Sequence, residues 1–397
     1  MSVMLLGDVC EINPSKKLAL SNDTEISFIP MEAISIDGHI DVSRSIPVEK
    51  VKNYTVFREG DILFAKITPC MENGKGAIAV GLRNSCGAGS TEFIVLRPNT
   101  ELVLPKWIYL FLSQKAFRLN CQQNMTGSAG QKRVPAKFLA KCCIPVPSLT
   151  EQERIIARIE ELFSQLDKGV ETLQKTKQQL AVYRQAVLKE AFDRIISDSK
   201  MQAIKSVCND IKVGIVIKPA QYYTDETNGI KAFRSANVRE FRINDTDWVY
   251  LTKEGHRSNL RSEIHTGDVL IVRSGYPGTA CVVSEEYNNC NAVDILIAVP
   301  NTDIVTSEYL CAFTNSPYGR KLVAEKKRGV AQAHLNVGGY SKMEIPVPEI
   351  SVQKQVVRSI EQRLSVYNGI SKTIDTALRQ AEAMRQSILK LAFEGGI

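Results

Sequence analysis

Apolar side chains recur every three or four residues along two long stretches, residues 155–191 and 356–391. This spacing gathers them into one narrow stripe along each helix, as in a coiled coil. A helix of about 40 residues spans about 60 Å, since each residue adds about 1.5 Å. One stripe per helix calls for one partner, so we expect the two helices to pair with each other.

The direction of that pair follows from the connectivity. Each predicted helix comes after its own long segment of mixed character, residues 1–147 and 197–348. An antiparallel pair would place these two mixed segments at opposite ends of a rod. A parallel pair would require the chain to return along the full length of the rod, so we expect the antiparallel arrangement.

Within the mixed segments, short apolar runs are bounded by Gly, Pro, Asn or Ser, which predicts strands and turns. In the first segment, strands are expected over residues 3–9, 27–34, 61–67, 76–80 and 92–96. A longer apolar pattern predicts one helix over residues 106–119 and its counterpart over residues 307–326.

The two halves of the chain also share a repeated sequence. Ile144-Pro145-Val146-Pro147 recurs as Ile345-Pro346-Val347-Pro348, an offset of 346 − 145 = 201. Without a gap, Gln152 then matches Gln353, Leu188-Lys189 matches Leu389-Lys390, and Ala191-Phe192 matches Ala392-Phe393. A repeat of this length exceeds a solenoid unit and indicates a duplicated module with internal pseudo-two-fold symmetry. The predicted fold class is α+β: two mixed α/β segments joined by two long helices paired as an antiparallel coiled coil.

Composition adds little to this picture. A net charge of +7 permits an anionic partner without requiring one. No apolar run approaches the roughly 18 residues of a membrane span, and residues 1–10 show no signal peptide pattern, so we expect a cytoplasmic protein without a membrane partner. None of the ten cysteines falls in a CxxC pair or near a histidine at zinc-finger spacing, so no metal site is expected in this chain.

The sequence contains little that resembles a catalytic centre. It has no phosphate-binding GxxxxGK[ST] loop, and its four histidines are not spaced as metal ligands or as a triad base. Asn315-Ser316-Pro317-Tyr318 resembles the tetrad with which amino-methyltransferases hold a flipped base. Because serine replaces its first proline and no S-adenosylmethionine loop precedes it, we expect it to interrupt or cap a helix.

Polar and basic loops of the mixed segments are the candidate binding site. Lys and Arg suit phosphate oxygens, while Arg, Asn and Gln also read base edges. The candidate DNA-binding residues of the first segment are Lys66, Thr68, Asn73, Lys75, Ser128, Gln131, Lys132 and Arg133. Those of the second segment are Arg273, Ser274, Tyr276, Lys327, Arg328, Gln332, His334 and Asn336.

These features together resemble the specificity subunit of type I restriction–modification systems. The frame is Gly and Gln, then I-P-x-P, then Glu-Gln, then a long helix ending near Leu-Lys-x-Ala-Phe, all occurring twice. The matching residues are Gly130-Gln131, Ile144 to Pro147, Glu151-Gln152 and residues 188–192, then Gly329, Gln332, Ile345 to Pro348, Gln353 and residues 389–393. Val352 replaces the usual glutamate before Gln353.

The resemblance implies a division into four parts: target recognition domains at residues 1–147 and 197–348, and conserved spacer helices at residues 148–196 and 349–397. Each recognition domain would read one half of a bipartite target in double-stranded DNA, and the spacer would set the gap between the halves. Two methyltransferase subunits would dock on the spacers, and motor-nuclease subunits would complete the complex. S-adenosylmethionine, ATP and magnesium would then belong to those partners, and this chain would not be an enzyme.

Two other classes of function stay open. One is a DNA methyltransferase or nuclease whose motifs have diverged. Turnover by the purified chain alone, with S-adenosylmethionine and DNA, would support that reading. The other is a coiled-coil scaffold that does not bind DNA, which salt-dependent, sequence-preferring DNA binding would exclude.

Overall fold

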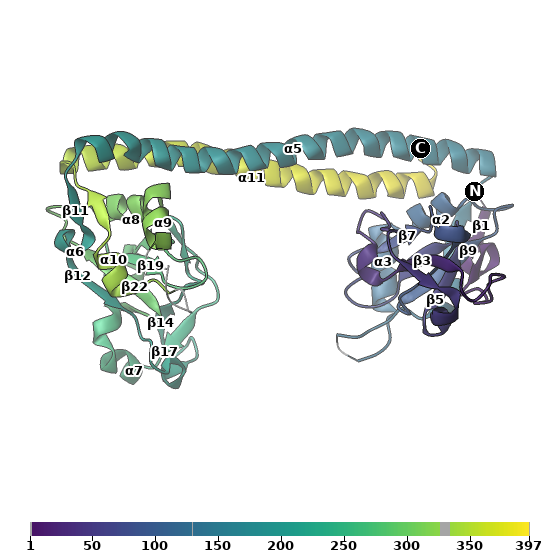
Figure 1. Cartoon of the computed structure of the whole chain (residues 1–397), viewed down its shortest axis with the longest axis horizontal. Coiled ribbons are helices and arrows are strands. Elements are labelled where there is room, and N and C mark those ends of the chain that lie inside the picture. Colours follow the sequence, from purple (N-terminus) through teal and green to yellow (C-terminus); the bar gives the residue numbers. More distant parts are fainter. Residues whose placement is uncertain (1, 129, 326–333, 397) are drawn as a thin grey trace. The chain divides into compact units, whose positions relative to one another are not determined.

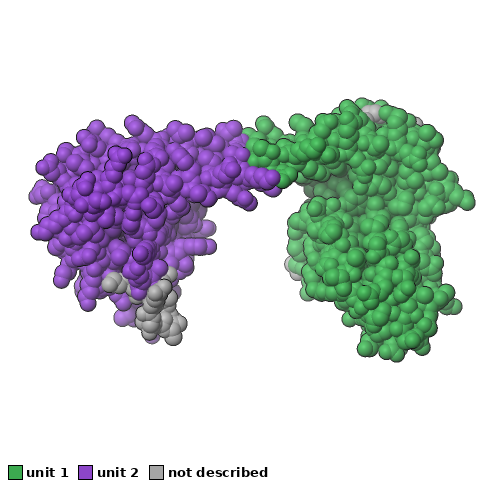
Figure 2. Space-filling view, turned by 45° about the horizontal axis from the view of Figure 1, so that its top comes forward, with its two compact units in different colours: residues 1–173, 376–397 green, residues 174–375 purple. Residues whose placement is uncertain are grey.

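The computed structural model describes residues 2–128, 130–325 and 334–396 (Figure 1). The chain forms two compact units, which Figure 2 colours separately. Unit 1 comprises Met1–Leu173 and Thr376–Ile397, and unit 2 comprises Gln174–Asp375. Each unit therefore contains one mixed segment and a part of each long helix, α5 (Leu149–Asp198) and α11 (Ile350–Glu394).

In unit 2 the two long helices pair in opposite directions. Lys177 Nζ lies 2.6 Å from Asp375 Oδ1, and Arg363 lies 2.9 Å from Glu190 Oε2 through its Nη1 atom. A later residue of α5 thus meets an earlier residue of α11. Between these pairs, Ile374 is buried and Leu364 belongs to the core of the unit.

Unit 1 repeats this pairing. Arg385 of α11 forms an ion pair with Asp167 of α5, and its guanidinium carbon lies 4.4 Å from the centroid of the Phe163 ring. Farther along α11, Leu389 shares one core cluster with Ile159 of α5. The antiparallel pairing is thus confirmed within each unit, and Gly169 and Gly369 interrupt neither helix.

Each mixed segment contains a four-stranded sheet with the same strand order. In unit 1 this order is β2 (Cys10–Ile12), β9 (Phe93–Pro98), β6 (Ile62–Ala65), β7 (Gly76–Ile78). In unit 2 it is β12 (Cys208–Val213), β22 (Ile295–Pro300), β19 (Val269–Val272), β20 (Ala280–Val282). All neighbours within both sheets are antiparallel.

A second sheet packs beneath the first in each unit. In unit 1 its order is β4 (Ser45–Pro47), β3 (Glu25–Ile29), β8 (Cys86–Gly89), β5 (Thr55–Arg58). In unit 2 it is β13 (Tyr223–Thr224), β17 (Val249–Leu251), β14 (Ile230–Phe233), β21 (Cys290–Ala292), β18 (Glu263–Ile264). The β3–β8 and β14–β21 pairs are both parallel, so the duplication extends to strand direction.

Shorter elements complete the two units. The strand pairs are β1 (Ser2–Leu5) with β10 (Cys143–Val146), β11 (Met201–Ala203) with β23 (Glu344–Pro346), and β15 (Val238–Arg239) with β16 (Arg242–Ile243). The remaining helices are α1 (Leu6–Val9), α2 (Pro105–Leu112), α3 (Lys115–Gln123), α4 (Ala136–Ala140), α6 (Ile204–Val207), α7 (Lys253–Ser258), α8 (Ser307–Asn315), α9 (Pro317–Glu325) and α10 (Val337–Ser341).

The central strands are buried on both faces, and their side chains alternate between two cores. Val269 and Ile271 of β19 pack toward the helices, whereas Leu270 and Val272 pack against the second sheet. Strand β6 of unit 1 alternates in the same way. Successive side chains of a strand point to opposite faces, so continuous apolar runs such as these suit a strand between two layers.

The repeated sequence motif forms the same buried contact in both units. The Gln152 amide donates to the carbonyl oxygens of Leu102 and Pro147, at 3.0 and 2.9 Å, and accepts from the Leu104 N–H at 2.9 Å. Gln353 makes the equivalent bonds to Ile304, Pro348 and Thr306. This contact attaches the start of each long helix to the mixed segment that precedes it.

Four predicted elements differ from the structure. The strand expected over residues 27–34 ends at Ile29, and a 3₁₀ helix follows over Met31–Ala33. The strand expected over residues 3–9 ends at Leu5 and continues as α1, because Leu6 and Val9 are both buried at helical spacing. The single helix expected over residues 106–119 divides into α2 and α3, with Gln114 extended between them. The helix expected over residues 307–326 divides at Ser316, because a residue before proline favours extended backbone.

Candidate nucleic-acid interface

In unit 1 the fold brings the two candidate loops together at the end of β6. The Val134 N–H donates to the carbonyl oxygen of Lys66 at 2.9 Å, and the Thr68 N–H donates to that of Lys132 at 3.1 Å. The Thr68 hydroxyl donates to the same Lys132 oxygen at 3.2 Å. The loop after β6 and the loop before α4 therefore form one surface, although more than 50 residues separate them.

The Lys side chains of this surface differ in whether they are bonded within the protein. Lys66 Nζ donates to the Thr91 carbonyl oxygen at 2.7 Å, and Lys75 Nζ donates to the Met31 carbonyl oxygen at 3.0 Å. Both ammonium groups are therefore held by backbone carbonyl oxygens. Asn73, Ser128, Gln131 and Lys132 are exposed.

Arg133 is committed to an ion pair within the protein. Its guanidinium donates to Glu92, with Nη2 at 2.8 Å from Oε1 and Nε at 2.9 Å from Oε2. This bidentate bond is the main reason that the pKa of the Glu92 carboxyl is held below its usual value. Arg133 can reach an external phosphate only by sharing or leaving Glu92.

The second unit forms a similar surface from different side chains. The Leu335 N–H donates to the Arg273 carbonyl oxygen at 3.1 Å, and Ser274 Oγ lies 2.5 Å from His334 Nδ1. The Tyr276 side chain is 85% exposed at the tip of the loop after β19. Such an exposed aromatic ring provides a flat apolar face beside polar groups.

Besides Ser274 and His334, the candidates Arg273 and Asn336 also have partners within the protein. Arg273 Nη1 lies 2.5 Å from Asp294 Oδ1, and its Nε donates to the Leu335 carbonyl oxygen at 3.2 Å. Asn336 accepts the Gly339 N–H at 2.7 Å and thereby caps α10. Lys327, Arg328 and Gln332 lie outside the described residues.

Glu92 and Asp294 are members of the site that sequence reasoning missed. Both directly precede the central strand of their sheet, β9 or β22. Each holds an arginine, but Arg133 comes from the loop before α4 and Arg273 comes from the end of β19. Their only signal in the sequence was an acidic residue at the same place in each repeat, immediately before the apolar run.

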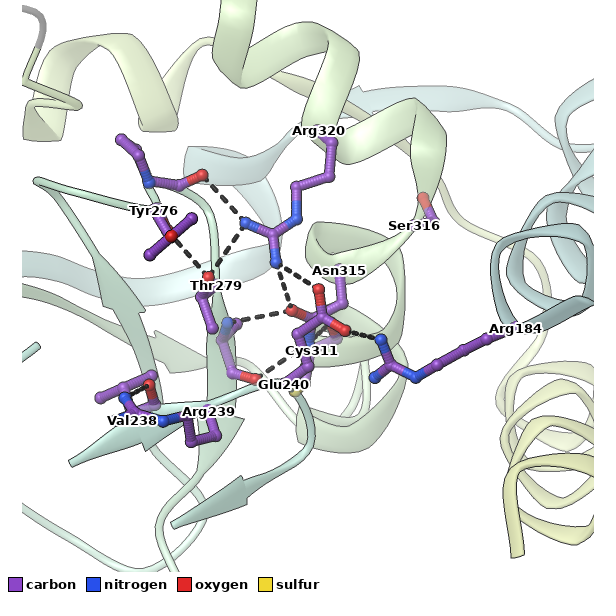
Figure 3. Close-up of polar contacts among 12 residues, drawn as sticks. Arg184, Val238, Arg239, Glu240, Tyr276, Thr279, Cys311, Asn315, Ser316 and Arg320 are labelled. Carbon is purple, nitrogen blue, oxygen red and sulfur yellow. Dashed lines mark hydrogen bonds and ion pairs between the residues drawn. The ribbon is translucent and has the colours of Figure 1, made fainter. Parts of the chain in front are cut away.

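A second missed group lies behind the Tyr276 loop (Figure 3). Arg320 of α9 donates to Glu240, in the turn between β15 and β16, at 2.8 Å. Arg184 of α5 pairs with the other carboxylate oxygen of Glu240. Nothing in the spacing of these three residues along the chain indicated that they meet.

Asn315 has a structural role, as the sequence predicts for its tetrad. It is buried, and its amide donates to the Ala280 carbonyl oxygen at 2.9 Å and accepts the Ala280 N–H at 3.0 Å. It thus ends α8 against the edge strand β20. Tyr318 of the same tetrad donates to Asp193 of α5.

Among the described residues, no helix is both long and apolar enough to cross a membrane. Across the same residues, no group of three or more His, Cys, Asp or Glu side chains is arranged to hold a metal ion.

The family model of the type I restriction modification DNA specificity domain matches residues 1–181. Among curated proteins, the chain is 46% identical over 168 residues to the type I restriction enzyme EcoAI specificity subunit of Escherichia coli. That match covers 41% of this chain and only 28% of the EcoAI subunit. The Escherichia coli EcoEI specificity subunit is 25% identical over 489 aligned positions, covering 97% of this chain and 82% of that protein.

Two solved structures have a similar fold. One comes from a structure of the type I R-M system that concerns complex assembly and conformational transition. It superimposes with a TM-score of 0.81 at 21% sequence identity, and the match covers 100% of this chain and 98% of that chain. The other is the HsdS subunit of Thermoanaerobacter tengcongensis, with a TM-score of 0.58 and 20% identity, covering 100% of this chain and 97% of that chain. The α+β fold predicted from the sequence is confirmed by these neighbours.

Proposed function

We propose that this chain, which belongs to the specificity-subunit family of type I restriction–modification systems, reads a bipartite sequence in double-stranded DNA with its two mixed segments. Each mixed segment reads one half of the target, and the long helices set the gap between the halves. The chain itself catalyses no reaction. It acts in the cytoplasm, as a subunit of a methyltransferase and restriction endonuclease complex.

One observation carries this proposal: the same scaffold occurs twice, and it presents different side chains at the same place. The loop after β6 offers Lys66 and Asn73, whereas the loop after β19 offers Arg273 and Tyr276. Lys and Arg contact phosphate oxygens, and polar side chains at loop tips reach base edges. A shared scaffold with divergent loops suits two readers of two different sequences.

The remaining activities would come from partner subunits. Two methyltransferase subunits would bind the long helices and supply S-adenosylmethionine for adenine methylation. Motor-nuclease subunits would supply the ATP- and magnesium-dependent reactions. The absence of nucleotide- and S-adenosylmethionine-binding motifs in the sequence supports this division.

A segment exchange tests the proposal. Residues 1–147 are replaced with the first mixed segment of another family member, and the chimera is expressed with its partner methyltransferase. Methylome sequencing should show a new first half of the methylated motif and an unchanged second half, because each scaffold carries its own loops.

The reciprocal exchange of residues 197–348 is the control, and it should change only the other half. A well-folded chimera that changes both halves, or neither, would contradict modular reading. An absence of any sequence-dependent methylation with the unaltered chain would contradict the proposed function as a whole.

A further inference from the structure

Arg320 holds the backbone of the loop that carries Tyr276. Its Nη1 atom donates to the Pro277 carbonyl oxygen at 3.0 Å and lies 3.1 Å from Thr279 Oγ1 (Figure 3). Both contacts fall within three residues of Tyr276, which is 85% exposed. The Arg320 side chain is only 26% exposed, so it holds the backbone of the loop while Tyr276 presents its ring to solvent.

Glu240 sets the place of the Arg320 guanidinium. Arg320 Nη2 donates to Glu240 Oε1 at 2.8 Å and to Asn315 Oδ1 at 3.3 Å. Because Asn315 is fully buried and bonded on both sides to Ala280, the guanidinium is fixed from two directions. Because Nη1 and Nη2 together donate to four different acceptors, the guanidinium has little freedom to rotate.

Arg184 extends this connection to the long helix. It pairs with the second oxygen of Glu240, so one carboxylate lies between two guanidinium groups. The side chains of Arg184, Glu240 and Arg320 are only 21%, 24% and 26% exposed. In such a half-buried place, removal of the carboxylate would leave two cations facing each other without compensation.

Unit 1 uses the corresponding residues differently. Arg118 is the fourth residue of α3, as Arg320 is of α9, and it lies against the loop after β6, where a Cβ atom on Gly74 would come within 2.8 Å of its Nη1. The counterpart of Arg184 at the offset of 201 is Arg385, which pairs with Asp167 of the partner helix. In unit 2, by contrast, the long helix α5 is connected to the Tyr276 loop through the carboxylate of Glu240.

We propose that Arg184, Glu240 and Arg320 form a positioning network that couples helix α5 to the Tyr276 loop and fixes this loop for reading the second half of the DNA target. The inference rests on the proposed function. It assigns these three side chains to sequence discrimination, although the loop stands between them and the DNA.

The test uses the full chain in complex with its methyltransferase subunits and DNA in which single bases of either half-site are altered. Glu240→Gln keeps the size of the side chain and removes its charge. It should reduce discrimination within the second half-site about tenfold, on the order of one lost base contact. Discrimination within the first half-site should not change. Glu240→Asp, which keeps the carboxylate, should retain most of the discrimination within the second half-site.

A double variant shows whether Arg184 and Glu240 act together or independently on discrimination. Because Arg184 acts through Glu240 in this network, Arg184→Gln should weaken discrimination by itself but add little in the Glu240→Gln background. Glu344→Gln, which removes an exposed carboxyl from β23 of the same unit, is the matched control and should leave both half-sites unaffected.

The outcomes are distinct. Unchanged discrimination in Glu240→Gln, or an equal loss at both half-sites, would overturn the positioning network while leaving the proposed function intact. If Glu240→Gln does not fold, Arg184→Gln carries the same comparison of half-sites, with Glu240→Asp as the conservative reference. A complex of the unaltered chain that prefers no sequence would overturn the proposed function, and this inference with it.

Discussion

At the scale of single residues, Gln152 and Gln353 explain why a glutamine recurs after each Ile-Pro-x-Pro motif. Each glutamine is fully buried and forms hydrogen bonds with one backbone N–H and two backbone carbonyl oxygens. Among the described residues, no other side chain bonds these three groups. Trp107 and Tyr309 add a bond to the neighbouring carbonyl oxygens of Pro145 and Pro346, at 2.9 and 3.0 Å. These repeated residues stabilise the fold, which frees the loops to diverge.

We predict that Gln152→Leu destabilises unit 1 strongly. The leucine would remove the partner of the Leu104 N–H and of two carbonyl oxygens around this fully buried position, at a cost of about 3 kcal/mol in unfolding free energy. Urea unfolding in a Trp248→Phe background measures this through Trp107, which is buried and becomes the sole tryptophan.

The control is Gln165→Leu, an exposed glutamine on the same helix whose side chain makes a 3.5 Å contact with Glu161. It should shift the unfolding midpoint little. Equal midpoints for the Gln152 variant and the unaltered chain would show that the buried contact does not hold the helix to its mixed segment.

Glu92 gives a prediction about pH. Its bond to Arg133 lowers the pKa of the folded carboxyl below the ordinary value of 4.5. A lowered folded pKa stabilises the protein fully above the unfolded pKa, and this stability is lost as the pH falls through the folded pKa. The difference in unfolding free energy between the unaltered chain and Glu92→Gln should therefore shrink as the pH falls from 7 to about 3.

Urea unfolding at several pH values measures this difference. Glu101→Gln, which removes an exposed carboxyl from the same unit, controls for the loss of one charge. A difference that grows toward low pH would mean that Glu92 is not stabilised by Arg133 in solution.

At the scale of elements, the long helices were predictable because their apolar spacing persists over many turns. The short helices were not, since single residues decide where they begin and end. Pro317 divides α8 from α9, and a buried Leu6 and Val9 turn the end of a predicted strand into α1. A periodic pattern over seven residues cannot distinguish these alternatives, because four residues fill only about one helical turn.

We predict that Ile374→Asp disrupts the helix pair in unit 2 by several kcal/mol, because it buries a charge without a partner. Ile374 is 4% exposed in α11. Leu166→Asp should have a smaller effect in unit 1, because Leu166 is only partly buried there. Thermal melting of each variant measures the loss.

Val366→Asp is the matched control, since Val366 lies on the same helix and is 61% exposed. It should leave the melting temperature nearly unchanged. No loss for Ile374→Asp relative to this control would count against the pairing of the helices.

At the scale of the whole molecule, the sequence predicted the duplication and the loops that form the candidate site. The sequence could not predict which Lys and Arg side chains are free of internal ion pairs and can therefore contact DNA. Arg133 and Arg273 look alike in the sequence, but each is held by a carboxylate that lies far away along the chain. Such pairings depend on strand order, which short-range patterns do not specify. The contact of Arg184 with Glu240 is hidden for the same reason.

We predict that the long helices act as a ruler for the gap between the half-sites, because α5 and α11 both pass from one unit to the other. Half-sites read on one face of DNA lie about 34–36 Å apart, centre to centre. Four residues are inserted in α5 near residues 175–179 and four in α11 at the facing position, since Lys177 meets Asp375 there. Each insertion adds about 6 Å, slightly more than one helical turn, so both apolar stripes stay roughly in phase.

An extension of about 6 Å corresponds to nearly two base pairs at about 3.4 Å each. The methylated motif should therefore keep both half-sites and gain one or two unread base pairs between them, as methylome sequencing would reveal. A two-residue insertion at the same positions is the control: it rotates the stripes by about half a turn and should impair the helix pair. An unchanged gap in a four-residue variant with normal assembly and activity would show that the helices do not set the spacing.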